Sequence, residues 1–329
     1  MGQAARYVLV LSALLLSTLY VLQTGDSPHP TAAVAATPVD VSPLLLTQAD
    51  TSGHEYFLKR HEVVPLGSEA IRLPILMYHY IRTPPSMKSD MLGYRLSVAP
   101  DVFETQMDWL YAHGYHPVNF NQVRAYFAGT DALPARPVVI TLDDGYRDLY
   151  TTAFPILKAH GFTAVAYIVP NFVGWPQYVT TEQVLELDRN GIEIASHTMS
   201  HANLAKMSYG SVMYELVQSK RWLEELVGHP VVDFAYPSGQ FTALTVAAVQ
   251  RAGYDTAVTE QVSLMHSRAD RYTWARVRVG GGELLPEFIA GLGPSMPSVT
   301  ITNLDVEAAA QAPAQPPAQP QAGQSLPDS

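Results

Sequence analysis

The sequence predicts an α/β protein in which parallel strands form a (β/α) barrel. Short apolar runs alternate with amphipathic helical stretches along the central part of the chain. The runs are apolar along their whole length, as in strands that are buried on both faces of a parallel sheet. About seven such units occur, which favours a barrel over an open sheet.

Each predicted element has a signal along its length or at its ends. The helical stretches carry apolar residues on one face and end at a glycine, as at Gly114, Gly161 and Gly191, and Thr180 is a suitable N-cap. The runs predicted as strands are 73–81, 137–142, 163–169, 192–196, 231–237, 254–259 and 274–279. The stretches predicted as helices are 101–115, 147–161, 180–191, 211–228 and 242–253.

Composition excludes several classes of site. The chain has 329 residues, a formal net charge of −10 and no cysteine. Nucleic acid is not an expected partner, because phosphate binding requires clustered Lys and Arg side chains. Without cysteine there are no disulfides and no thiolate ligands. Any metal must therefore be held by His, Asp or Glu.

Both ends of the chain differ from its centre. An uncharged apolar run at 7–22 follows Arg6, and no Lys or Arg occurs again before Lys59. This pattern predicts a signal-anchor or a signal peptide, with the bulk of the chain beyond the cytoplasmic membrane, either anchored or secreted. The predicted divisions are a signal segment 1–23, a flexible linker 24–60, a folded domain 61–290 and a Pro/Gln/Ala-rich tail 291–329.

Two pairs of polar side chains follow predicted strands. Asp143 and Asp144 follow one strand, and His197 and His201 follow another. Functional groups of parallel α/β folds gather at this carboxyl edge, so we expect the pairs to converge. A bound cation would relieve the repulsion between the two carboxylates. On a helical turn, the spacing of His197 and His201 would put both rings on one side, so that they and one carboxylate can hold a divalent metal.

Each pair also has an ordinary structural explanation. An Asp-Asp-Gly sequence is commonly a solvated turn, and two histidines four residues apart are commonly surface or core residues. Their occurrence together, at strand ends of one sheet, favours the metal site.

The stretches "TLDDG", "SHTMSH" and "YPSG", in this order and spacing, resemble the motifs of the polysaccharide deacetylase family, which is also called the NodB-homology domain or carbohydrate esterase family 4. The resemblance covers residues 74–279, and "PILMYHYI" is similar to the branch of the poly-N-acetylglucosamine deacetylases. It implies a distorted (β/α) barrel of the NodB type. It also implies that Asp143 is the base and that Asp144, His197 and His201 hold one divalent metal. The expected ion is Zn²⁺, with Co²⁺, Ni²⁺ or Fe²⁺ as alternatives.

Two positions depart from the family pattern. The arginine that braces the base is replaced by Ala235, and Arg276 is the candidate to replace it from another strand, unless it makes only a surface ion pair. The late histidine that supplies a general acid has no clear counterpart. His79 is the candidate acid, with a buried structural histidine as the alternative. His266 is expected to lie on the surface.

Four residues are predicted to bind the substrate. Tyr236, Pro237 and Ser238 belong to "YPSG", and the resemblance makes the amide of Ser238 the donor to the tetrahedral oxyanion. Trp175 either stacks on a sugar ring or is a packed loop aromatic.

The predicted function is a metal-dependent hydrolase that removes acetyl groups, chiefly N-acetyl groups of N-acetylglucosamine units, from a cell-wall or extracellular polysaccharide. Asp143 would take a proton from metal-bound water as that water attacks the acetyl carbonyl. The expected partners are the acetylated polysaccharide and the cytoplasmic membrane. A carbohydrate-binding cell-wall module of weak activity is one alternative. A non-haem Fe(II) oxygenase, which also uses two histidines and one carboxylate, is less favoured because its usual β-barrel does not match this α/β alternation.

Overall fold

A computed structural model describes residues 63–64 and 68–293. The predicted signal segment 1–23, the linker 24–60 and the tail from residue 294 onward lie outside the described residues. Among the helices that are described, none has the combination of length and apolar content that crossing a bilayer requires.

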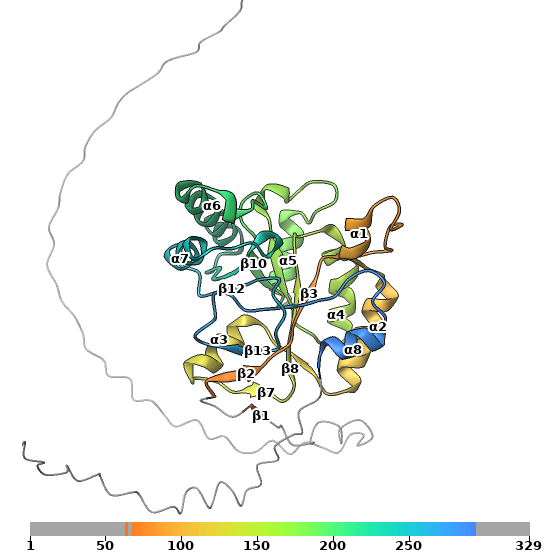
Figure 1. The fold of residues 1–329 in the computed structure, drawn as a ribbon. Coiled ribbons are helices and arrows are strands. Elements are labelled where there is room, and N and C mark those ends of the chain that lie inside the picture. The colour runs from red at the N-terminus through yellow and green to blue at the C-terminus, as the bar shows by residue number, and fades with distance from the viewer. Residues whose placement is uncertain (1–62, 65–67, 294–329) are drawn as a thin grey trace, which may run out of the picture. The chain divides into compact units, whose positions relative to one another are not determined.

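A parallel β-sheet forms the centre of this part of the chain (Figure 1). Its strands are β3 (Ile75–Tyr78), β6 (His116–Pro117), β8 (Pro137–Leu142), β9 (Val165–Ile168), β10 (Glu193–Ser196), β11 (Asp233–Ala235), β12 (Thr256–Val258) and β14 (Val277–Arg278). The order across the sheet is β12-β11-β10-β9-β8-β3-β14, with β6 also beside β8. All of these pairs are parallel, which confirms the predicted α/β class.

The two edges of this sheet are linked by the segment that leads into β14. The backbone N–H of Trp274 donates to Ala257 O (3.0 Å), and that of Thr259 donates to Trp274 O (2.8 Å). A few residues later, Val277 pairs with Leu76 of β3. The sheet therefore curls into a half barrel. The predicted barrel is present in this partly closed form.

Short antiparallel and parallel pairs accompany the main sheet. They are β1 (Val63–Val64) with β7 (Leu133–Pro134), β2 (Ala70–Arg72) with β13 (Met265–Ser267), and β4 (Tyr80–Ile81) with β5 (Ser97–Val98). β1, β2, β7 and β13 lie together at the lower end of the view in Figure 1. The sequence did not predict β1, β2, β5, β7 and β13, because strands of two or three residues leave no readable period-2 pattern, whereas β4 lies within the predicted run 73–81.

Helices pack around the sheet and complete the crossovers between its strands. They are α1 (Met91–Leu96), α2 (Pro100–Ala112), α3 (Phe120–Ala128), α4 (Phe154–Ala159), α5 (Thr181–Arg189), α6 (Tyr209–Val227), α7 (Ala243–Arg251) and α8 (Leu285–Gly291). The five predicted helices are confirmed, and the Thr180 capping box begins α5 as expected. The stretch predicted at 147–161 starts as a π-helical turn, Leu149–Ala153, before α4. Pro155 has no N–H to donate at that point of an α-helix.

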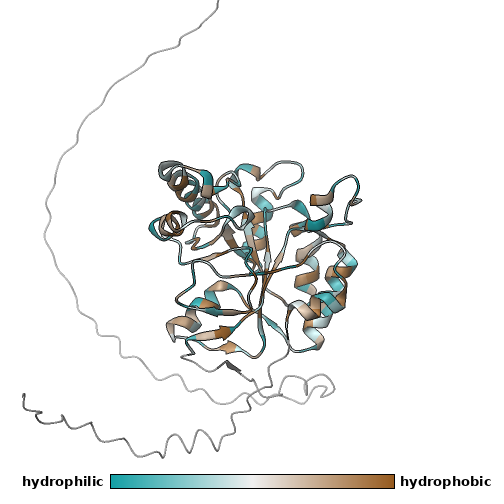
Figure 2. Cartoon of the chain, in the orientation of Figure 1, coloured by the Kyte–Doolittle hydropathy of each residue, from teal (hydrophilic) through white to brown (hydrophobic). Residues whose placement is uncertain are grey.

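Apolar side chains fill both sides of the curled sheet. Alternate residues of β3 belong to different clusters: Leu76 faces the helical layer, whereas Ile75 lies in the cluster that also contains Tyr167 and Trp274. Figure 2 accordingly shows the central strands mostly brown and the helices in mixed colours. Burial on both faces explains the uninterrupted apolar runs, and it holds the strand ends as rigid supports for the residues that follow.

Candidate active site

Side chains that follow β3, β8 and β10 meet at the carboxyl edge of the sheet, and the guanidinium of Arg276 joins them from the amino end of β14. His79 directly follows β3, Asp143 and Asp144 follow β8, His197 follows β10, and Arg276 directly precedes β14. All five are less than a tenth exposed. Charged groups this deeply buried must be paired with one another or with an ion.

Asp144, His197 and His201 form a cluster of metal-ligand type. One ligand atom of each lies within 4.8 Å of the other two. Oδ1 of Asp144 is 3.4 Å from Nε2 of His197 and 3.2 Å from Nε2 of His201. Burial raises the pKa of the Asp144 carboxyl, but the two imidazoles outweigh burial and hold that pKa well below its usual value.

The tautomer of His197 suits a metal ligand. Its Nδ1 lies 2.8 Å from Ala235 O at the end of β11, and a carbonyl can only accept. The proton is therefore on Nδ1, and the lone pair of Nε2 faces Asp144. The Oδ1 atom of Asp144 is buried and accepts no hydrogen bond from the described residues. This donor set fits a divalent cation with positions left open for water.

The histidine pair is not carried by a helical turn, contrary to the sequence prediction. Thr198 (φ 64°) and His201 (φ 58°) have left-handed backbone conformations, as do Asp144 (φ 70°) and Ser238 (φ 54°). Among the described non-glycine residues only Arg136 shares this property. Such conformations cost of order 1–3 kcal/mol each and persist where the surroundings fix them. Their concentration here marks a site whose geometry is imposed by the fold.

The loop between the two histidines is fixed by a side chain of α6. Glu215 is buried, and its carboxylate accepts from the backbone N–H of Ser200 (2.9 Å) and from the Ser200 hydroxyl (2.7 Å). The Thr198 hydroxyl accepts from the backbone N–H of Ala202 (3.1 Å). These bonds hold the loop in the turn that brings His201 back toward Asp144.

Asp143 points to a different partner from its neighbour. Arg276 donates from Nη1 to Oδ1 (2.7 Å) and from Nη2 to Oδ2 (2.8 Å) of Asp143. Arg276 also bonds the hydroxyl of Thr141 (3.1 Å) and the carbonyl of Thr259 (2.9 Å). Burial raises the pKa of Asp143, but the guanidinium outweighs burial and lowers it. The alternative that Arg276 makes only a surface ion pair is wrong.

His79 lies on the other side of Asp143. Its Nε2 is 3.9 Å from Oδ2 of Asp143. Burial lowers the pKa of His79, and the carboxylates of Asp143 and Asp144 only partly offset that effect. The ring is therefore neutral at pH 7 and can receive a proton.

The chain resembles known proteins in sequence and in structure. The sequence profile of the family described as "Polysaccharide deacetylase" matches residues 130–257. A Bacillus subtilis protein named for that family, YxkH, is 30% identical over 211 residues, which are 64% of this chain and 72% of the relative. The chain belongs to the polysaccharide deacetylase family.

Other relatives carry more specific names. The Escherichia coli (strain K12) poly-beta-1,6-N-acetyl-D-glucosamine N-deacetylase is 28% identical over 237 residues, which span 59% of this chain but only 35% of that protein. Among solved structures, the Streptococcus pyogenes deacetylase PplD in complex with acetate is similar with a TM-score of 0.63 and 26% identity. That match covers 68% of this chain and 99% of PplD.

The residues of "YPSG" are distributed differently within this deacetylase domain. Ser238 is exposed on the turn after β11. The Tyr236 side chain is instead buried in a cluster with Phe234, and its hydroxyl donates to Tyr272 O (3.2 Å). The prediction that Tyr236 contacts the substrate is therefore wrong for its side chain, because the ring packs on the side of α6 and α7. Pro237 is buried in the same turn.

Trp175 lies in the loop after β9 and is 54% exposed. Its ring contacts Phe172 (5.1 Å between centroids) and Tyr178 (6.1 Å). Its exposure distinguishes it from a packed loop aromatic, and half of its surface is available to a ligand.

Sequence reasoning missed one ion pair of the deacetylase and misplaced one histidine. Arg278 pairs with Glu260, which follows β12, and Arg278 also acts electrostatically on His79. The two-residue spacing of Arg276 and Arg278 was the available signal, since alternate strand residues share a face. His266 is buried in β13 rather than exposed, and burial lowers its pKa to about 4. Its polar sequence neighbours concealed this.

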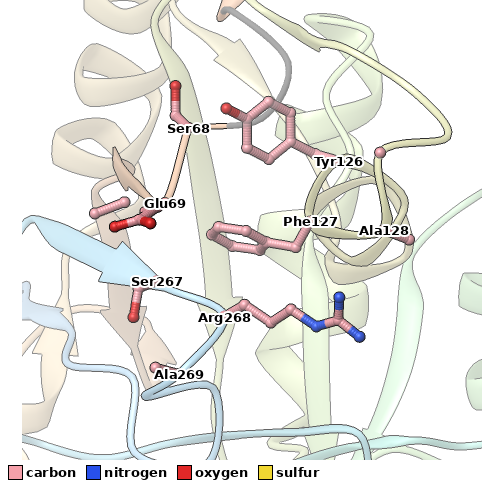
Figure 3. A pocket seen from close by; sticks show the side chains of 10 residues that line it. Ser68, Glu69, Tyr126, Phe127, Ala128, Ser267, Arg268 and Ala269 are labelled. Carbon is pink, nitrogen blue, oxygen red and sulfur yellow. The ribbon is translucent and has the colours of Figure 1, made fainter. Parts of the chain in front are cut away.

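A separate cavity lies away from these residues. It has a volume of about 580 Å³, and Figure 3 shows Phe127 of α3 projecting between Glu69 and Arg268. The helix α3 and strand β2 that border it lead into the amino ends of β8 and β3, whereas Asp143 and His79 follow the carboxyl ends. This cavity is therefore not part of the candidate active site.

Proposed function

We propose that this protein hydrolyses acetyl groups, chiefly the N-acetyl groups of N-acetylglucosamine units, from a cell-wall or extracellular polysaccharide. The observation that carries the proposal is the pair of neighbouring aspartates with separate partners, one beside two histidines and one held by an arginine. Family membership supports the reaction, and the name of the Escherichia coli relative supports N-acetylglucosamine as the sugar.

Asp144, His197 and His201 would hold one divalent cation, for which zinc is our first choice and Co²⁺, Ni²⁺ or Fe²⁺ the alternatives. When bound, the cation would polarise the acetyl carbonyl and acidify water. The low pKa of Asp144 favours this role, because the carboxylate is then ionised over the physiological range.

Asp143 would act as the general base. Its lowered pKa keeps it ionised at neutral pH, and both of its oxygens are fixed in position by Arg276. Arg276 thereby does what the family arginine would do from the position that Ala235 holds here. His79 Nε2 is 3.9 Å from Asp143 Oδ2, so a proton accepted by Asp143 can be relayed through His79 to the leaving amine.

The remaining roles concern the substrate. The backbone N–H of Ser238 would donate to the oxyanion that forms at the attacked carbonyl, with Pro237 and the backbone of Tyr236 holding the turn. Trp175 would stack on a sugar ring. For localisation, the apolar run after Arg6 leads us to propose an extracytoplasmic protein that is anchored in the membrane or secreted.

The binding-module alternative loses its main support. It depended on the missing family arginine and late histidine, and Arg276 and His79 both lie beside Asp143. The oxygenase alternative is disfavoured by the parallel α/β sheet.

Acetate release tests the proposal. Purified protein is incubated with poly-N-acetylglucosamine, chitin oligomers, peptidoglycan and acetylated xylan, with added Zn²⁺ or with a chelator. We expect release from at least one N-acetylated glycan, loss of release with the chelator and recovery on addition of metal. Absence of release from every glycan, in protein that contains stoichiometric metal, would leave binding as the function.

A further inference from the structure

Three tyrosines from three separate segments stack beside the candidate metal ligands. The rings of Tyr80 and Tyr146 are 3.5 Å apart between centroids, and those of Tyr146 and Tyr178 are 5.1 Å apart. The guanidinium of Arg82 covers Tyr80 at 3.5 Å. Tyr146 is buried in the middle of this phenol row (Tyr80, Tyr146 and Tyr178), whereas Tyr80 and Tyr178 at its two ends are partly exposed.

The phenol row is close to Asp144. Tyr80 follows His79 in the sequence, and Tyr146 follows Asp144 by two residues. The backbone of Tyr146 forms an antiparallel β-bridge with that of Tyr178. Tyr146 hydrogen-bonds with both of its neighbours in the row. The hydroxyl groups therefore form one linked set next to the site of reaction.

The loop that carries Tyr178 and Trp175 is tied to the turn that carries the aspartates. The backbone N–H of Val179 donates to Gly145 O (3.0 Å). Arg147 donates from Nε to Tyr178 O (2.9 Å) and from Nη2 to Trp175 O (3.2 Å). The loop thus keeps a fixed position relative to Asp144, with the indole of Trp175 at its exposed end.

We propose that the phenol row and Trp175 form a binding wall for the sugar units next to the one that loses its acetyl group. The inference rests on the proposed function and narrows its substrate to glycan chains of several units. A sugar ring has an apolar C–H face, which packs on an aromatic face, and a rim of hydroxyls, which bond to phenols. Trp175 supplies the face, and the partly exposed phenols of Tyr80 and Tyr178 supply the hydroxyls.

The preference of the enzyme for longer or shorter oligomers tests the proposed binding wall. kcat/KM is measured on an N-acetylglucosamine pentamer and dimer that have the same linkage, with full-length protein and saturating Zn²⁺. We expect the wild type to prefer the pentamer. Trp175→Ala should reduce the pentamer-to-dimer ratio by about tenfold, mainly through KM, because a buried aromatic contact is lost. Tyr178→Phe, which removes only a hydroxyl, should reduce it by about two- to tenfold.

Tyr214→Ala is the matched control, since Tyr214 is 60% exposed on α6 and has no place in the wall. Its ratio should equal that of the wild type. Melting curves establish that each variant is folded. A second measurement avoids turnover: pentamer is titrated into chelator-treated protein, and the fluorescence change of the wild type should be lost in Trp175→Phe.

The outcomes separate the two proposals. No acetate release by the wild type from either oligomer would contradict the proposed function. Release with equal kcat/KM for both oligomers would contradict the proposed binding wall, and so would an unchanged pentamer-to-dimer ratio in folded Trp175→Ala and Tyr178→Phe. Either result would leave the proposed deacetylase function intact.

Discussion

Adjacent residues of identical chemistry have different surroundings at this site. Asp143 receives two hydrogen bonds from Arg276, whereas Asp144 faces His197 and His201. Their partners, rather than their own chemistry, therefore distinguish the proposed base from the proposed metal ligand.

Amide substitutions should separate these roles. Asp143→Asn keeps the side-chain volume but cannot accept the proton, so metal should stay bound while kcat falls by about 10²–10⁴-fold. Asp144→Asn replaces an anionic ligand by a neutral one, so metal content should fall, and excess cation should restore part of the activity by mass action. Elemental analysis and acetate release measure both effects.

Two outcomes would contradict these roles. Metal lost from Asp143→Asn and kept by Asp144→Asn would reverse the assignment. Small and equal effects of both substitutions on metal content and activity would mean that the two aspartates only form a solvated turn.

The sequence predicted the residues of the candidate site more securely than the residues that hold them in position. Asp143, Asp144, His197 and His201 stand in short contiguous motifs, so their spacing was readable. Arg276 is 133 residues from Asp143 in the sequence, and only the curl of the sheet brings them together. The buried partner Glu215 looks like any polar residue of an amphipathic helix, and its bond to Ser200 depends on tertiary packing.

At the scale of elements, β10 begins with a buried carboxylate that ties α3 to the sheet. Oε2 of Glu193 accepts from the backbone N–H of Phe120 (2.7 Å), and Oε1 is 3.4 Å from Arg124 Nη2. Arg124 also pairs with Asp233 of β11. Burial raises the pKa of Glu193 well above its usual value, and the Asp233 carboxylate adds to this. Glu193 can therefore keep a proton in the folded protein at a pH at which a free glutamic acid has lost it.

The raised pKa of Glu193 should make stability fall as pH rises. The folded protein holds a proton on Glu193 above the usual pKa of 4.5, whereas the unfolded chain releases it. The stabilisation is complete below that pKa and is lost as pH rises toward the folded pKa, by at most about 1.4 kcal/mol per pH unit. Glu193→Gln imitates the protonated form. We expect its melting temperature to match the wild type near pH 5 and to exceed it at pH 8.

Comparing Glu193→Gln with the wild type removes the contribution that the other titrating groups make to the pH dependence of stability. Asp233, Asp255 and Tyr167 also act on this cluster, and they are the same in both proteins. Parallel melting curves of wild type and Glu193→Gln from pH 5 to pH 8 would show that Glu193 is ionised throughout. Denaturation is followed by circular dichroism at constant ionic strength.

At the scale of the whole molecule, the fold class was readable because the central strands β3, β8 and β9 are buried on both faces. The elements that escaped prediction are short ones, such as β2 and β13, or α3 and α8, which the sequence analysis did not separate from loops. They pair or pack with segments far away in the chain, so local sequence carries little of the information that forms them.

The boundaries of the folded domain give the last prediction. α8 ends at Gly291, and the next residue, Leu292, is fully buried and accepts a hydrogen bond from Arg72 through its carbonyl. A chain of residues 62–293 should therefore melt cooperatively and keep acetate release, because it retains every described core residue. A chain that ends at residue 290 lacks Leu292 and its core contacts. Loss of one buried leucine costs about 2–5 kcal/mol, so its melting temperature should be roughly 5–15 °C lower.

The same pair of chains tests the role of the N-terminal segment. If residues 1–61 serve only as anchor and linker, the 62–293 chain should leave the membrane fraction while its melting temperature equals that of the full-length protein in detergent. Aggregation of the 62–293 chain, or a melting temperature far below that of the full chain, would mean that residues outside 62–293 contribute to the core. Equal melting temperatures for the chains that end at 290 and 293 would mean that Leu292 does not.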